Sequence, residues 1–183
     1  MSKKIAVHLA NGFEEIEAIS IIDVLRRADL DVVVVSVTGK LEVNGAHQIS
    51  VLADKLFENV DYSDIYMIVL PGGMPGSSNL DAHEGLKTQI MTFANEKKQL
   101  AAICAAPLVF GNLGLLDGKK AVCYPGFERY LKGAEIQNTA VVDFENIVTG
   151  KGPGVAIPFA LKIVEKVVSA ERAATLGKQM IVM

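Results

Sequence analysis

The chain has 183 residues, of which half are apolar and 21% are charged, so the composition excludes a disordered chain and predicts one domain over 1–183. The net charge of −3 argues against nucleic acid as the main partner, because phosphate binding needs a basic surface. Two cysteines are too few for a disulfide framework and indicate reduced thiols.

The first half of the chain alternates short apolar runs with amphipathic segments. The run 5–10 holds His8 and stops at Asn11-Gly12, so it predicts a strand and a turn and argues against a secretory signal. No apolar run is long enough to span a membrane, and we expect a cytoplasmic protein without a membrane partner. The pattern predicts further strands over 32–37 and 64–70, a hairpin around 43–46 with Leu41 and Ile49 on its arms, and helices over 15–28 and 84–95.

The second half continues the same alternation. A strand over 100–103 runs directly into Cys104, and Pro107 lies in the first turn of the helix that follows. The remaining predictions are a helix over 105–113, short strands over 141–142 and 147–148, and helices over 153–168 and 170–180. This order predicts an α/β fold with a mostly parallel sheet, in which ligands bind at the carboxyl ends of the strands.

Several common site motifs are absent from the sequence. No G-x-G-x-x-G follows the first strand, and no cysteine or histidine pair has metal-ligand spacing, so we predict neither a cofactor nor a metal. The glycine-rich segment Gly150–Gly154 precedes a helix. It is either an anion-binding loop or a tight strand-to-helix turn.

Cys104 is the most informative residue, because it lies between a buried strand and a helix. Small alanines flank it, as in the nucleophile elbow of hydrolases. A helix N-terminus offers N–H groups and a positive dipole end, so we expect the pKa of the Cys104 thiol to fall. The alternative is a buried structural cysteine.

Two other segments reach the same edge of the sheet. Gly72-Gly73 follows a neighbouring strand, and its N–H groups could face an oxyanion beside Cys104, although an ordinary loop is the alternative. Of the three glutamates at 14, 15 and 17, at least one or two are expected to be solvated helix-dipole acids, and Glu17 is the one expected to turn inward. Burial would raise the pKa of Glu17 and keep it protonated, able to donate a hydrogen bond to a thiolate.

The resemblance to a known family rests on five segments: 11–17, 23–28, 69–73, 101–107 and 152–154. With matches that run in order from residue 3 to about 168, they resemble the ThiJ/PfpI superfamily. Within it they look most like the branch that contains the parkinsonism-associated protein deglycase. The resemblance implies a flavodoxin-like three-layer α/β sandwich and a homodimer. It assigns the nucleophilic, oxidisable cysteine to Cys104, its protonated glutamate partner to Glu17, and the oxyanion-binding N–H groups to Gly73 and Ala105.

The sequence departs from that family at two positions. Relatives often carry a histidine where Tyr124 precedes Pro125, and tyrosine, with a pKa of about 10, is a poor base at neutral pH. Relatives also tend to have an arginine where this chain has His47, which could hold an anion or shuttle a proton, or simply be an exposed hairpin residue. Cys123 is either a second thiol of the site or a buried small residue.

Two functions follow from the resemblance and the site. The first is a cofactor-independent glyoxalase or protein deglycase that acts on methylglyoxal or on early glycation adducts of proteins. The second is an oxidative-stress sensor or redox-regulated chaperone that uses the same cysteine.

Overall fold

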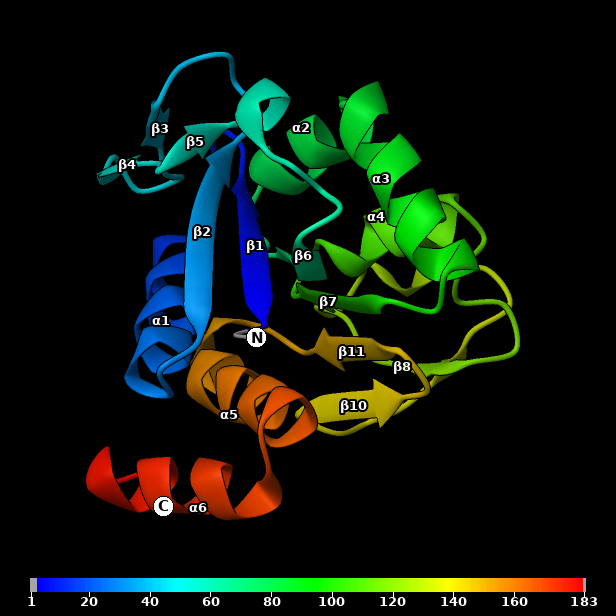
Figure 1. Ribbon diagram of the computed structural model, residues 1–183. Coiled ribbons are helices and arrows are strands. Elements are labelled where there is room, and N and C mark those ends of the chain that lie inside the picture. Colours follow the sequence, from blue (N-terminus) through cyan, green and yellow to red (C-terminus); the bar gives the residue numbers. More distant parts are fainter. Residues whose placement is uncertain (1–2, 183) are drawn as a thin grey trace.

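The computed structural model describes residues 3–182, which fold around one seven-stranded sheet (Figure 1). Neighbouring strands are parallel except at one edge of the sheet, where the strands Val141–Phe144 and Ile147–Gly150 pair antiparallel. In spatial order the strands are β10 (Val141–Phe144), β11 (Ile147–Gly150), β7 (Gln99–Ile103), β6 (Ile65–Leu70), β1 (Lys4–Leu9), β2 (Asp31–Ser36) and β5 (Lys55–Leu56).

Helices cover both faces of the sheet, so its central strands are buried on both sides. Alternate residues of β2 show the division: Val32 and Val34 belong to one apolar core, whereas Val33 and Val35 belong to the other. The first core is covered by α1 (Glu15–Arg27) and α5 (Ala156–Val167), with α6 (Ala170–Gln179) packed on α5. The second is covered by α2 (Gly76–Ala82), α3 (Glu84–Asn95) and α4 (Pro107–Asn112). The predicted three-layer α/β sandwich with a mostly parallel sheet is confirmed.

Smaller elements lie outside the main sheet. β3 (Glu42–Asn44) and β4 (Ser50–Leu52) form a hairpin at the predicted place, but neither predicted arm residue lies in a strand: Leu41 precedes β3, and Ile49 belongs to the loop because Asn44 pairs with Ser50. β8 (Lys120–Ala121) pairs with β9 (Glu135–Ile136). Three short 3-10 helices complete the fold: η1 (Phe57–Asn59), η2 (Glu128–Tyr130) and η3 (Pro153–Val155).

Two helix starts differ from the prediction. The helix expected from 105 begins at Pro107, because Cys104 to Ala106 form a turn. The helix expected from 153 begins at Ala156, after the 3-10 turn η3 that contains Pro153 and Gly154. Within residues 3–182, no helix combines the length and the apolar character that crossing a membrane would require.

Candidate active site

Cys104 occupies a strained turn at the carboxyl end of β7. Its φ of 65° lies in the left-handed region, which residues with a side chain rarely adopt. Two hydrogen bonds hold this conformation: the Cys104 N–H donates to the Gly150 carbonyl at 2.9 Å, and the Tyr124 N–H donates to the Cys104 carbonyl at 2.8 Å. The thiol therefore sits on a fixed elbow between β7 and α4, as the sequence predicted.

Glu17 turns inward from the first turn of α1 and is fully buried. Its Oε2 accepts the Gly72 N–H at 2.7 Å, whereas Oε1 has no hydrogen-bond partner among the described residues. Burial raises the pKa of Glu17 to about 7, although the Gly72 bond and the Cys104 thiol act in the opposite direction. The carboxyl group therefore changes its protonation near neutral pH.

The pKa of the Cys104 thiol does not fall as expected from the helix start. Burial, and then the charge of Glu17 and its hydrogen bonding to the thiol, raise the pKa of Cys104 to about 12. The N–H groups of Gly73 and Ala105 point at the sulfur and lower the pKa, but by less. The pKa of the folded thiol is thus raised, contrary to the predicted fall, because desolvation and the neighbouring carboxyl group outweigh the N–H groups at the helix start.

Gly72 and Gly73 bring the β6 edge close to both groups. A Cβ atom at Gly72 would lie 2.6 Å from the Cβ of Cys104 and 2.7 Å from Oε2 of Glu17. Gly73 has a φ of +91°, and a Cβ there would lie 2.4 Å from the Glu14 nitrogen. A larger residue at Gly72 would push Cys104 and Glu17 apart, and one at Gly73 would collide with the backbone of residues 12–14 that leads into α1.

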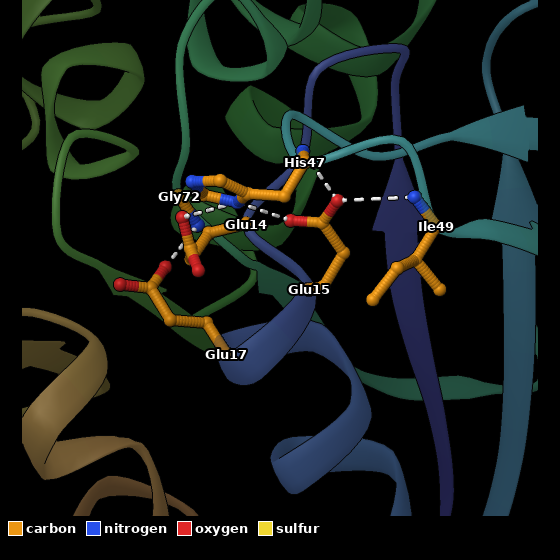
Figure 2. A network of polar contacts seen from close by, with 6 residues as sticks. All are labelled: Glu14, Glu15, Glu17, His47, Ile49 and Gly72. Carbon is orange, nitrogen blue, oxygen red and sulfur yellow. Dashed lines mark hydrogen bonds and ion pairs between the residues drawn. The ribbon is translucent and has the colours of Figure 1, made fainter.

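A second polar network lies beside Glu17, around the buried Glu15 (Figure 2). Its Oε1 accepts the backbone N–H groups of His47 at 2.5 Å and Ile49 at 3.4 Å. Its Oε2 lies 2.8 Å from Nδ1 of His47, and a Glu14 oxygen lies 3.7 Å from the same nitrogen. Glu15 therefore ties the hairpin loop to α1, and it is not one of the solvated helix-dipole acids expected among the three glutamates.

This network shifts the titration of both partners. The hydrogen bond to Glu15 raises the pKa of His47, and the charges of Glu14 and Glu15 add to the effect. Burial by itself would raise the pKa of Glu15, but the hydrogen bonds from the His47 side chain and from the loop N–H groups outweigh it and lower the pKa. The exposed His47 imidazole is therefore engaged by acids rather than free to hold an anion.

Glu14, Glu15 and His47 are also the one group of donors in residues 3–182 that could hold a metal ion, with ligand atoms within 4.8 Å of one another. The hydrogen bonds described above already use both oxygens of Glu15. The arrangement is accounted for as a structural ion pair.

Tyr124 lies on the other side of Cys104, with 46% of its surface exposed. A groove of about 340 Å³ opens beside it, bounded also by Pro125 and the segment 151–155. The glycine-rich segment thus forms a turn and one wall of this groove. Neighbouring Cys123 is buried, and burial followed by the charge of Glu128 raises its pKa to about 12.

Comparison with known proteins gives matches along nearly the whole chain. The DJ-1/PfpI family model matches residues 3–166. Protein dj-1beta of Drosophila melanogaster is 34% identical over 184 residues, which cover 100% of this chain and 98% of the relative. Protein DJ-1 homolog B of Arabidopsis thaliana is 38% identical over 174 residues, 94% of this chain. The match spans only 40% of that plant relative's length.

The solved structures agree with these matches. The oxidized DJ-1 of Toxoplasma gondii has a TM-score of 0.94 at 39% identity, and the match covers 98% of both chains. The crystal structure of Drosophila melanogaster DJ-1beta has a TM-score of 0.95 at 34% identity and is covered completely, as is this chain.

Proposed function

The chain belongs to the DJ-1/PfpI family, and we propose that it is a cofactor-independent enzyme of the glyoxalase or protein-deglycase type. Its substrates are methylglyoxal and related 2-oxoaldehydes, or the early adducts they form on proteins. We place the activity in the cytoplasm, where its thiols stay reduced. The observation that carries the proposal is a cysteine on a left-handed elbow beside a buried glutamate whose pKa is near 7.

In this mechanism Glu17 is the base that converts the Cys104 thiol into the nucleophilic thiolate. At neutral pH a large share of Glu17 is ionised while Cys104 is still a thiol, since their pKa values are about 7 and about 12. A base with a pKa close to the working pH is effective at proton transfer. Glu17 takes the Cys104 proton as the sulfur attacks, so the acid-plus-thiolate pair exists when the substrate is present.

The steps then balance without any redox partner. The sulfur forms a bond to the aldehyde carbon, and Glu17 returns its proton to the aldehyde oxygen, which gives a hemithioacetal. Glu17 next removes the hydrogen of that carbon and delivers it to the neighbouring ketone carbon, while the ketone oxygen gains the hydroxyl proton. Water cleaves the resulting thioester, which releases the 2-hydroxy acid and restores the thiol.

Backbone donors stabilise the charge that develops on oxygen. The N–H groups of Gly73 and Ala105 converge on the position of the Cys104 sulfur, where an attacked carbonyl would lie. Gly72 keeps the distance between Cys104 and Glu17 short. Tyr124 borders the groove beside Cys104, and His47 holds the hairpin loop at the site through Glu15.

We also propose a homodimer. Large apolar side chains are exposed on α1, at Ile16 and Ile19, and on the hairpin, at Ile49 and Leu52. Ile19 and Leu52 line one hollow together with the charged Asp23, Arg26 and Asp54, so the exposed apolar side chains of α1 and the hairpin share one surface with a charged rim. Sedimentation should give a mass of two chains for the wild type, and Ile19→Glu should shift it toward one.

Oxidation sensing is the second candidate, and the oxidized state of the Toxoplasma gondii structure favours it. In this case two molecules of hydrogen peroxide convert the Cys104 thiol to a sulfinic acid and yield two molecules of water. The buried Glu17, with its free Oε1, would donate a hydrogen bond to the sulfinate.

Lactate release from methylglyoxal separates the two candidates. We expect turnover by the wild type and none above background by Cys104→Ser. Glu17→Asp should reduce turnover more than a hundredfold, because it withdraws the carboxyl group from the reacting atoms, while peroxide should still add two oxygens to Cys104. If the wild type gives no lactate but Cys104 oxidises selectively over Cys123, the sensor is the correct function.

A further inference from the structure

The groove beside Tyr124 is lined by two segments whose backbones are hydrogen-bonded to the backbone of Cys104. It measures about 340 Å³, and its lining residues are Tyr124, Pro125, Lys151, Gly152, Pro153, Gly154 and Val155. One wall is tied to the Cys104 carbonyl through the Tyr124 N–H at 2.8 Å. The other wall continues from Gly150, whose carbonyl accepts the Cys104 N–H at 2.9 Å. Both walls of the groove therefore neighbour the elbow through its backbone.

The lining is flat and apolar. A Cβ atom at Gly152 would lie 3.1 Å from Cδ2 of Tyr124, so the absence of a side chain there leaves this side of the ring uncovered. Prolines contribute to both walls, and the one ammonium group in the lining, that of Lys151, is engaged by Asn138 Oδ1 at 3.0 Å. A planar apolar group could stack on the half-exposed Tyr124 ring.

The charged groups near Cys104 are mostly acidic. Glu17 is close enough to raise the pKa of the thiol, and Glu14 lies close enough to raise the pKa of Glu17. The imidazole of His47 is paired with Glu15 at 2.8 Å. A carboxylate or phosphate at the reacting end of the substrate would be repelled by these acids.

We propose that the site selects 2-oxoaldehydes with a flat apolar substituent, such as an aryl group, over methylglyoxal. This inference rests on the proposed function and specifies its substrate class. The aldehyde reacts at Cys104 while the substituent lies in the groove against Tyr124. A methyl group fills little of a groove of about 340 Å³, whereas an aryl group covers the tyrosine ring and displaces water from both proline walls.

The test compares initial rates with methylglyoxal and phenylglyoxal. We expect kcat/KM for phenylglyoxal to be about tenfold higher or more in the wild type. Tyr124→Ala should reduce this ratio about tenfold, and the matched variant Tyr124→Phe, which keeps the ring, should hold it within about twofold.

The outcomes distinguish the inference from the proposed function. Equal kcat/KM values for both aldehydes, or a ratio that survives Tyr124→Ala, would overturn the inference and leave the proposed function standing. Turnover of neither aldehyde would overturn the proposed function. In that case, or if Tyr124→Ala does not fold, the unreactive ketone acetophenone is titrated into the wild type. Amide chemical-shift changes at Tyr124 and Gly152 would support the groove, and their absence would overturn it.

Discussion

The side chains of Glu17 and Cys104 meet across Gly72. A Cβ atom there would lie 2.7 Å from Oε2 of Glu17 and 2.6 Å from the Cβ of Cys104. The Gly72 N–H also donates to Glu17 at 2.7 Å, so one residue both separates the two groups and fixes the carboxyl group. The charge of Glu17 raises the pKa of Cys104, whereas the hydrogen bond with Cys104 lowers the pKa of Glu17. The two groups therefore titrate as a coupled pair.

Gly72→Ala should therefore damage the pair. The methyl group would contact Cys104, Glu17 and the Ile103 carbonyl within 2.8 Å, and overpacking of this kind costs about 1–3 kcal/mol of unfolding free energy. We expect a lower denaturation midpoint and a large loss of Cys104 alkylation or turnover. Gly177→Ala is the matched control, because its Cβ would meet only Leu161 at an ordinary 3.4 Å. Normal reactivity in Gly72→Ala would show that the close approach is unimportant.

A different buried group, His8, should make the fold sensitive to acid. Its Nε2 lies 2.8 Å from the Tyr62 hydroxyl, while its Nδ1 has no hydrogen-bond partner among the described residues. Burial lowers the pKa of His8 from 6.5 to about 3, and the nearby His83 acts in the same direction. Between these values the unfolded chain binds a proton that the folded chain does not. The free energy of unfolding therefore falls as pH falls, by up to about 1.4 kcal/mol per pH unit.

Urea unfolding between pH 7 and pH 4 checks this prediction. His8→Leu should flatten the decline of stability with falling pH, whatever it does to the stability at pH 7. Tyr62→Phe removes the hydrogen bond but keeps the imidazole, so it should keep the decline. Parallel curves for the wild type and His8→Leu would contradict the account.

The ion pair between Glu15 and His47 should be visible by NMR. The pKa of His47 is raised by Glu15, so its imidazole should titrate above 6.5, and Glu15→Gln should move the pKa back down. The contribution of a group with a raised pKa is fully present below its unfolded pKa and is lost as pH rises through the folded one. At pH values above the raised pKa of His47 the hairpin loop should be held less tightly, so its backbone amides should exchange faster with solvent. A His47 pKa that is not raised would contradict the pairing.

Much of the fold follows from local patterns that the sequence displays. The strands and long helices show clear apolar periodicity, and the predicted helix over 84–95 has the same first and last residues as α3. The short helix α2 was missed, because its sequence GSSNLDA consists mostly of weak helix formers and it buries only Gly76, Ser77 and Leu80. Its helical form is imposed by packing, which no local pattern records.

The site was predictable in position but not in its electrostatics. Glu17 could be chosen by its place on the inner face of α1, and Cys104 by its place after β7. The burial of Glu15 could not, because it depends on a hairpin loop that returns from residues 47–49 to cap its carboxylate. The sign of the Cys104 shift was also missed, because the extent of desolvation depends on the whole packed site rather than on the helix start.

The rate of Cys104 alkylation by iodoacetamide as a function of pH, with peptide mapping to separate Cys104 from Cys123, tests the central claim most directly. If Glu17 is the base for the thiol, the wild-type rate should rise through an inflection near pH 7, where Glu17 ionises. Glu17→Gln should lose that inflection and react more slowly at pH 8. A Glu17→Gln variant that reacts faster than the wild type at pH 8 would show that Glu17 only repels the thiolate, and would contradict the account.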